Sequence, residues 1–183
     1  MRSFFVGRAM GTIIVLIIVA IFFFFNKEDF YEKERISLQQ KGHKNASYMV
    51  EGGLVLLRDG QSEVEAESGM DVKIITRYFG NEARGDLNAD GKEDIAFILT
   101  QSSGGTGTFY YVVAALKTDD GYIGTNAILI GDRIAPQTTE IRDGQIIVNY
   151  AVRASHEPMA ARPSIGTSKY LKIFGSTLME VLY

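Results

Sequence analysis

Residues 94–117 read DIAFILTQSSGGTGTFYYVVAALK. The runs DIAFILT (94–100) and TFYYVVAALK (108–117) are rich in β-branched and aromatic residues, which favour β-strands. The glycine-rich stretch QSSGGTGTF (101–109) lacks the lysine and the helix start of a phosphate-binding loop, so we interpret it as a hairpin connection. Two central strands joined by a loop are therefore predicted in this part of the chain.

Short β-like runs and turn signals continue on both sides of this stretch. Asp-Gly and Gly-Ser pairs predict hairpins at 59–60, 143–144 and 175–176, and further strands are expected at 71–79 and 122–131. The prolines are expected in loops between strands: Pro136, Pro158 and Pro163. The predicted fold class is mainly β, with an N-terminal transmembrane helix followed by one antiparallel β-sandwich or partial barrel.

The stretch GDLNADGKED (85–94) places oxygen-bearing side chains at alternate positions of a short loop. Gly91 allows the tight turn, and Lys92 would offer its backbone carbonyl. Calcium takes about six to eight oxygen ligands, and this spacing supplies them from a few residues. The predicted ligands of a structural calcium ion are Asp86, Asn88, Asp90, Lys92 and Asp94. A polar turn without a metal is the alternative interpretation.

The spacing of this loop resembles that of two known calcium loops. An EF-hand has a glutamate at position 12 on a helix, whereas Phe97 in an apolar strand-like run stands here. The pattern is more similar to the DxDxDGxxD loops of FG-GAP and VCBS-type repeats, which lead into a strand and bind calcium structurally on exported or surface proteins. Those repeats build β-propellers from several copies, so the single copy in this chain predicts no propeller.

The wider stretch from Tyr48 to the C-terminus, including GDLNADGKEDIAFILTQSSGGTGTFYYVVAAL, IGDRI and DGQIIVNY, also resembles a small uncharacterised domain of exported or membrane-anchored bacterial proteins. This resemblance implies a location outside the cytoplasm and a β-rich fold. It implies no activity.

The N-terminal run AMGTIIVLIIVAIFFFF (9–25) is uncharged, and as a helix it would span about 25 Å. Arg2 and Arg8 precede it, so the positive-inside tendency predicts a cytoplasmic tip over residues 1–8. Residues 9–25 are predicted to be an uncleaved signal anchor, which places the following chain in the periplasm or outside the cell. A cleaved signal peptide is the alternative.

The segment NKEDFYEKERISLQQKGHKNA (26–46) is rich in charge and poor in apolar periodicity. It is predicted to be a charged stalk, followed by an outward-facing β-rich domain over residues 47–183. His43 is expected to be a solvated linker residue, because no second histidine, cysteine or acid cluster accompanies it. The chain contains no cysteine, which excludes a disulfide framework and a lipidation site.

The charge balance argues against nucleic acid as a partner. The chain has 19 basic and 22 acidic residues, and two of the basic ones lie in the predicted cytoplasmic tip. We expect a non-enzymatic module at the membrane that binds another envelope protein or a polymer. No catalytic residue is assigned.

Two other functions stay open. The long irregular segment around His156, with Ser155 and Ser164 nearby, would suit a membrane-anchored hydrolase, although no GxSxG or HExxH pattern is present. A pilin-like assembly subunit would be processed after Gly7, but Thr12 stands where pilins carry a glutamate.

Overall fold

The computed structural model describes residues 42–66 and 72–182. The predicted cytoplasmic tip, the predicted membrane anchor and the first sixteen residues of the predicted stalk (26–41) lie outside these ranges. Within the described part, no helix combines the length and the apolar character that crossing a bilayer requires. Helical structure there is limited to one 3-10 turn, η1 (His43–Asn45).

The described part of the chain forms the strands β1 (Ser47–Val50), β2 (Gly53–Leu56), β3 (Gln61–Glu65), β4 (Lys73–Gly85), β5 (Asp94–Ser102), β6 (Phe109–Thr118), β7 (Gly121–Gly124), β8 (Ile128–Asp132), β9 (Ala135–Arg142), β10 (Gln145–Val152), β11 (Ile165–Phe174) and β12 (Thr177–Glu180).

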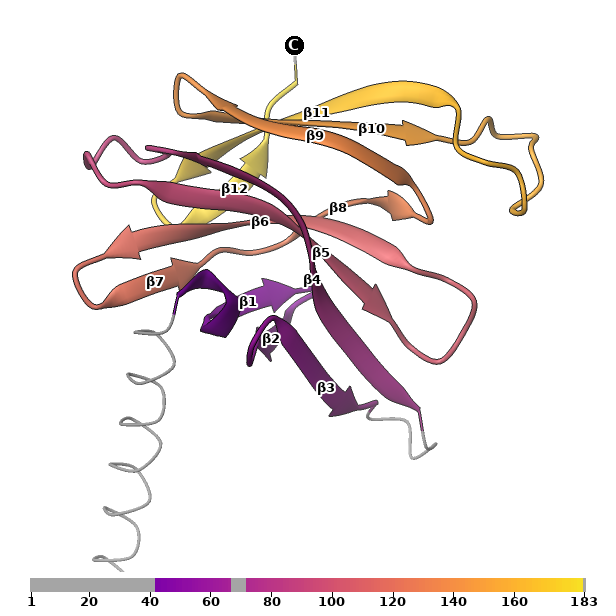
Figure 1. Ribbon diagram of the computed structural model, residues 1–183, viewed down its shortest axis with the longest axis horizontal. Helices are drawn as coiled ribbons and strands as arrows, with labels where there is room; N and C mark the ends of the chain where they lie inside the picture. Colours follow the sequence, from indigo (N-terminus) through magenta and orange to yellow (C-terminus); the bar gives the residue numbers. More distant parts are fainter. Residues whose placement is uncertain (1–41, 67–71, 183) are drawn as a thin grey trace, which may run out of the picture. The chain divides into compact units, whose positions relative to one another are not determined.

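These strands form three antiparallel sheets (Figure 1). The largest has six strands in the order β3-β4-β5-β6-β7, with β8 also paired to β6. The second sheet has the order β12-β11-β10-β9 and packs on one face of the first, while the β1–β2 hairpin covers the opposite face. The prediction of a mainly β, antiparallel domain is confirmed, and the packing is sandwich-like.

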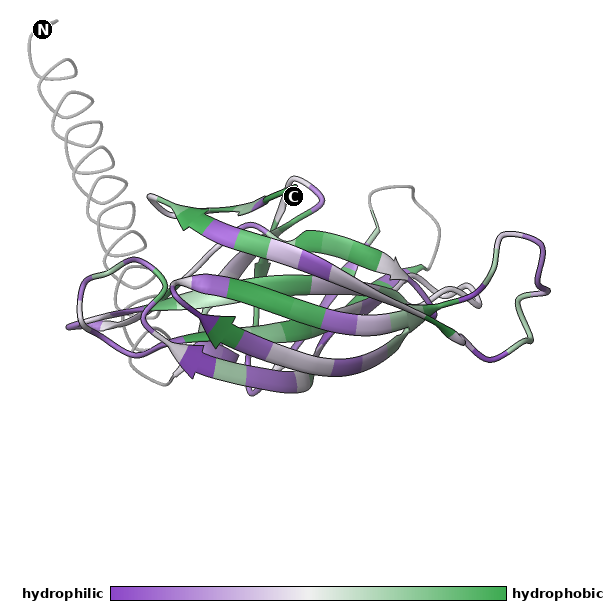
Figure 2. Ribbon diagram, turned by 90° about the horizontal axis from the view of Figure 1, so that it is seen from above, coloured by the Kyte–Doolittle hydropathy of each residue, from purple (hydrophilic) through white to green (hydrophobic). Residues whose placement is uncertain are grey.

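The central strands β5 and β6 are buried on both faces. Ile98 and Val112 pack towards the four-stranded sheet, whereas Phe97 and Val113 pack towards the β1–β2 hairpin. Strands that are covered on both faces have near-continuous apolar sequences, which explains the unbroken runs in DIAFIL and YYVVAAL. Other strands alternate between apolar and polar residues, as the colours in Figure 2 show.

Two of the predicted hairpins are confirmed. Strands β9 and β10 meet at Asp143-Gly144, and β11 and β12 meet at Gly175-Ser176. Asp143 and Gly144 have φ angles of 52° and 69°, the left-handed conformation that a primed two-residue turn requires.

The hairpin predicted around Asp59-Gly60 is wrong in its strand pairing. Strand β2 pairs with β1 across Glu51-Gly52, and β3 pairs with β4. The Asp59-Gly60 turn closes only the isolated bridge between Arg58 and Gln61. Both turns contain two residues with positive φ, so the local sequence signals a turn without deciding which strands stay paired beyond it.

Pro136 also departs from the prediction, because it lies in β9 opposite Tyr150. The register shifts next to this pair, and β9 is the edge strand of its sheet. A missing N–H is tolerated at an edge or a bulge, so a proline fits there. Pro158 and Pro163 lie between β10 and β11, as predicted.

We expect Phe97→Ala to lower the free energy of unfolding by roughly 3 to 5 kcal/mol, because it removes a fully buried ring from a central strand. This ring also makes an edge-to-face contact with Tyr48 at 5.4 Å between centroids. Phe109→Ala is the matched control, since the Phe109 side chain is 38% exposed and should cost much less. Urea unfolding of the full-length chain in detergent measures both, and equal losses would contradict this account of the core.

Candidate functional site

The predicted calcium loop connects β4 to β5 and folds back on its own backbone. The carboxylate of Asp86 accepts hydrogen bonds from the backbone N–H groups of Asp90 at 3.2 Å and Gly91 at 2.9 Å. These bonds, and the one from Gly91 most of all, hold the pKa of Asp86 below its usual value. Gly91 has a φ of 80°, a conformation in which a side chain would be strained.

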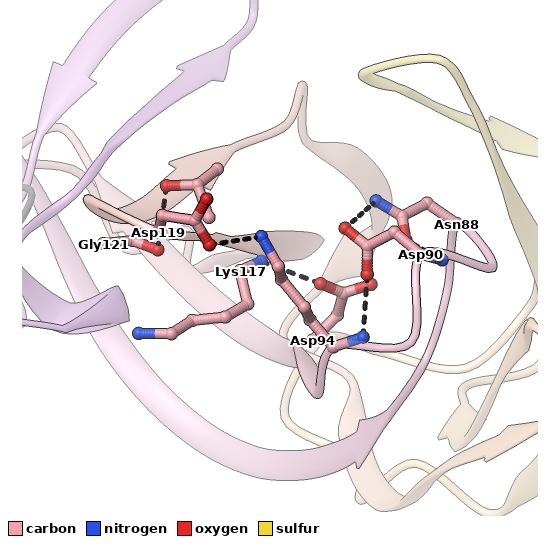
Figure 3. Close-up of polar contacts among 8 residues, drawn as sticks. Asn88, Asp90, Asp94, Lys117, Asp119 and Gly121 are labelled. Atoms are coloured by element: carbon pink, nitrogen blue, oxygen red, sulfur yellow. Dashed lines mark hydrogen bonds and ion pairs between the residues drawn. The ribbon is translucent and has the colours of Figure 1, made fainter.

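Asn88 and Asp90 form the exposed tip of the loop (Figure 3). Asn88 Oδ1 accepts a hydrogen bond from the Asp90 N–H at 3.1 Å, and Asn88 Nδ2 donates to Asp90 Oδ2 at 3.2 Å. Asp90 Oδ1 accepts from the Lys92 N–H at 2.8 Å. Side chains that bond to nearby backbone in this way fix a tight turn.

Asp94 differs from the other acids because its side chain is fully buried. Its Oδ2 accepts the Leu87 N–H at 2.9 Å, and its Oδ1 accepts the Lys117 N–H at 2.7 Å. The carboxylate therefore ties the loop and the start of β5 to β6. Burial raises the pKa of Asp94, the nearby charges of Asp90 and Asp86 raise it further, and the two hydrogen bonds oppose this rise.

The sequence indicated Asp94 only as a metal ligand. Its structural role depends on Lys117, which follows 23 residues later and reaches Asp94 only because β5 and β6 are neighbours. No local spacing signals such a contact, so sequence reasoning missed it.

Besides the hydrogen bond between Asp94 and β6, Lys92 links the loop to the turn that joins β6 to β7. Its ammonium group lies 2.7 Å from Asp119 Oδ1 (Figure 3). An open cleft of about 530 Å³ lies beside this ion pair, and the Lys117 ammonium sits 4.6 Å from the centroid of the Tyr122 ring in its wall. The residues that line the cleft are Lys92, Glu93, Lys117, Thr118, Asp119 and Tyr122.

The donor chemistry of the loop fits calcium. Asp86, Asn88 and Asp90 supply carboxylate and amide oxygens, and each oxygen keeps acceptor capacity beside the hydrogen bonds described above. A dication would also offset the repulsion among the loop carboxylates that is felt at Asp94. In residues 42–66 and 72–182, no group of three or more His, Cys, Asp or Glu side chains is spaced to hold a metal, so calcium stays a prediction.

The loop between β10 and β11 exposes the residues of the hydrolase hypothesis, Ser155, His156 and Ser164. Arg153 braces this loop, because its guanidinium donates to the carbonyls of Ala161 at 2.5 Å and Arg133 at 2.7 Å. Ser155 lines a neighbouring cleft of about 300 Å³, whereas His156 is not among the lining residues.

His43 is a residue whose surroundings sequence reasoning missed. The prediction of a solvated linker residue is wrong, because the side chain is only 11% exposed. It lies among the rings of Tyr78, Phe97 and Tyr122, at centroid distances of 5.8, 5.2 and 6.1 Å. These rings come from three strands that are distant in sequence, so no nearby residue could have signalled the burial.

No protein-family model, curated protein or solved structure matches this chain. The resemblance of its loop to FG-GAP and VCBS-type loops therefore stays a prediction. Its function is inferred from the residues described above.

We expect Asp94→Asn to destabilise the domain by about 1 to 3 kcal/mol, because the amide leaves one buried N–H without an acceptor. The loss should be the same in EDTA and in calcium. Asp119→Asn is the control, since it alters an exposed ion pair that solvent screens and that contributes little to stability. A loss that appears only with calcium would instead make Asp94 chiefly a metal ligand.

Proposed function

We propose that this chain is a non-enzymatic binding module held at the outer face of a membrane, with a structural calcium ion in the loop 86–94. The tether is the apolar run 9–25, and the β-rich domain faces the periplasm or the cell exterior. Its partner is another envelope protein or a polymer.

The calcium proposal is supported by one observation: several oxygen donors lie close together on a loop whose base is anchored to β6. Asp86, Asn88 and Asp90 lie close enough to share hydrogen bonds with one another's backbone and side chains. Beneath them Asp94 fixes the loop to β6, so the donors are held in place before a metal arrives. Preorganised hard oxygen donors favour calcium over softer metals.

Calcium binding would stabilise the folded domain. A ligand that binds only the folded form stabilises it by about 2.7 kcal/mol at 100 times its dissociation constant. Extracellular calcium modules have dissociation constants on the order of 0.1 to 1 mM, so even a weak site fits a domain outside the cytoplasm.

The binding role is supported by the cleft beside the calcium loop. Lys92 contributes its backbone to the loop and its side chain to the cleft wall, where it meets Asp119. Ordering of the loop would therefore hold one wall of the cleft in place.

We expect calcium, and not magnesium, to raise the melting temperature of the full-length chain in detergent above its value in EDTA. Asp86→Ala should abolish this rise, because it removes a ligand. It should lower the melting temperature in EDTA only modestly, because the two backbone N–H groups that lose their acceptor are exposed and can bond to water. Asp120→Ala is the control, since it removes a nearby exposed acid outside the loop. An equal calcium response in both variants would reject the site.

The binding role is tested by immobilising the full-length chain and passing envelope extract over it. A protein or polymer should be retained with calcium, should be lost in EDTA and with Asp86→Ala, and should be unaffected by His156→Ala. Turnover of an envelope component that His156→Ala abolishes would support the hydrolase instead.

A further inference from the structure

Residues Gly42–Ala46, named here the entry segment, are bound to the domain through their backbone. The Gly60 N–H donates to the Lys44 carbonyl at 2.8 Å, and the Asp59 N–H donates to Asn45 Oδ1 at 2.8 Å. The segment that leads into the domain is therefore held on the Asp59-Gly60 turn.

Side chains add to this attachment. The Tyr48 hydroxyl donates to the His43 carbonyl at 2.6 Å, and the Lys44 ammonium lies 3.9 Å from the centroid of the Tyr78 ring. The His43 imidazole inserts between rings supplied by β4, β5 and β7. The His43 side chain thus anchors the entry segment to the domain.

The imidazole faces charges of both signs. Its Nε2 is buried and lies 2.6 Å from Glu82 Oε1, a contact that becomes an ion pair when the imidazole is protonated. Arg84 lies beside the same carboxylate at 3.8 Å. The titratable and charged groups that surround His43 are Lys44 in the entry segment, Tyr48 on β1, Tyr78, Glu82 and Arg84 on β4, and Tyr122 on β7, with Lys117 of β6 over the Tyr122 ring.

We propose that His43 is an acid-sensitive clasp, which holds the entry segment on the domain while its imidazole is neutral and releases it when the imidazole is protonated. The clasp rests on three observations: the ring pocket, the near-complete burial of the side chain, and the hydrogen bonds that the next two residues make to the Asp59-Gly60 turn.

The direction of the pH dependence follows from the burial. Burial lowers the pKa of His43 below its ordinary value of 6.5 and outweighs the opposing influence of Glu82, while Lys44 and Arg84 lower it further. The released segment therefore takes up a proton more readily than the docked one. Docking is strongest above about pH 6.5 and weakens as the pH falls through that value.

The clasp would change how the domain is held. If the N-terminal run is the membrane tether proposed above, each residue released from the entry segment adds up to about 3.4 Å to the reach of the domain. The clasp itself needs neither the tether nor calcium, so its test is independent of the proposed function.

Amide hydrogen exchange of the full-length chain in detergent tests the clasp. The Asp59 and Gly60 amides should exchange faster at about pH 5.5 than at about pH 7.5, after correction for the intrinsic rates. Uptake of one proton limits this acceleration to about tenfold per pH unit. The Thr125 amide, which donates to the Ala114 carbonyl within the core, is the internal control and should not respond.

Two variants separate protonation from packing. His43→Phe keeps a ring in the pocket but cannot take up a proton, so the pH response of Asp59 and Gly60 should disappear. Glu82→Gln removes the carboxylate that favours the charged imidazole, so the response should still begin near pH 6.5 but should continue to lower pH and become larger. A pH response that persists in His43→Phe, or that is missing from the unmodified chain, would overturn the proposal.

A third measurement applies even if His43→Phe does not fold. The imidazole signal of His43 can be titrated by NMR in the unmodified chain, whose only other histidine is His156. A midpoint below 6.5 supports the clasp. A midpoint above that value would mean that protonation strengthens docking, and it would overturn the proposal.

Discussion

The burial of β5 and β6 on both faces is the constraint on which the other elements of the domain depend. A sheet whose central strands are apolar on both sides needs two covering layers, since either exposed face would leave apolar side chains in water. The four-stranded sheet supplies one layer and the β1–β2 hairpin supplies the other. The hairpin alone is too short to be stable, so it depends on this packing as much as the sheet does.

The same constraint explains the position of Asp94. It stands at the first residue of β5, directly before the apolar run 95–99, and burying a carboxylate there is costly unless its oxygens are bonded. The backbone N–H groups of Leu87 and Lys117 each donate a hydrogen bond to one of these oxygens. One acid of the loop thus serves the core, and the acids at the exposed tip stay available to a cation. This division fixes the base of the loop without a metal and leaves the exposed tip as the part that a cation would order.

The parts of the fold that sequence predicts are those fixed by neighbouring residues. The strands of DIAFILT and TFYYVVAALK, and the hairpins at Asp143-Gly144 and Gly175-Ser176, follow from local propensity and turn geometry. The burial of His43 depends on contacts with distant strands, which no local pattern encodes. The pairing of β3 with the next strand, β4, was missed because two turn signals compete in this part of the chain. For the candidate site the limit is similar, because spacing shows which oxygens are near one another but not which of them a distant backbone already uses.

The Tyr122 ring connects the two regions to which we assign roles. The centroid of the His43 ring lies 6.1 Å from that of Tyr122, and the Lys117 ammonium lies 4.6 Å from the centroid of the same Tyr122 ring. Lys117 also donates its backbone N–H to Asp94, which anchors the loop of oxygen donors. A ring that loses a packing partner gains freedom to move, so departure of His43 would loosen the wall of the cleft beside that loop. Tyr122 is thus a shared neighbour of the entry segment and of the cleft.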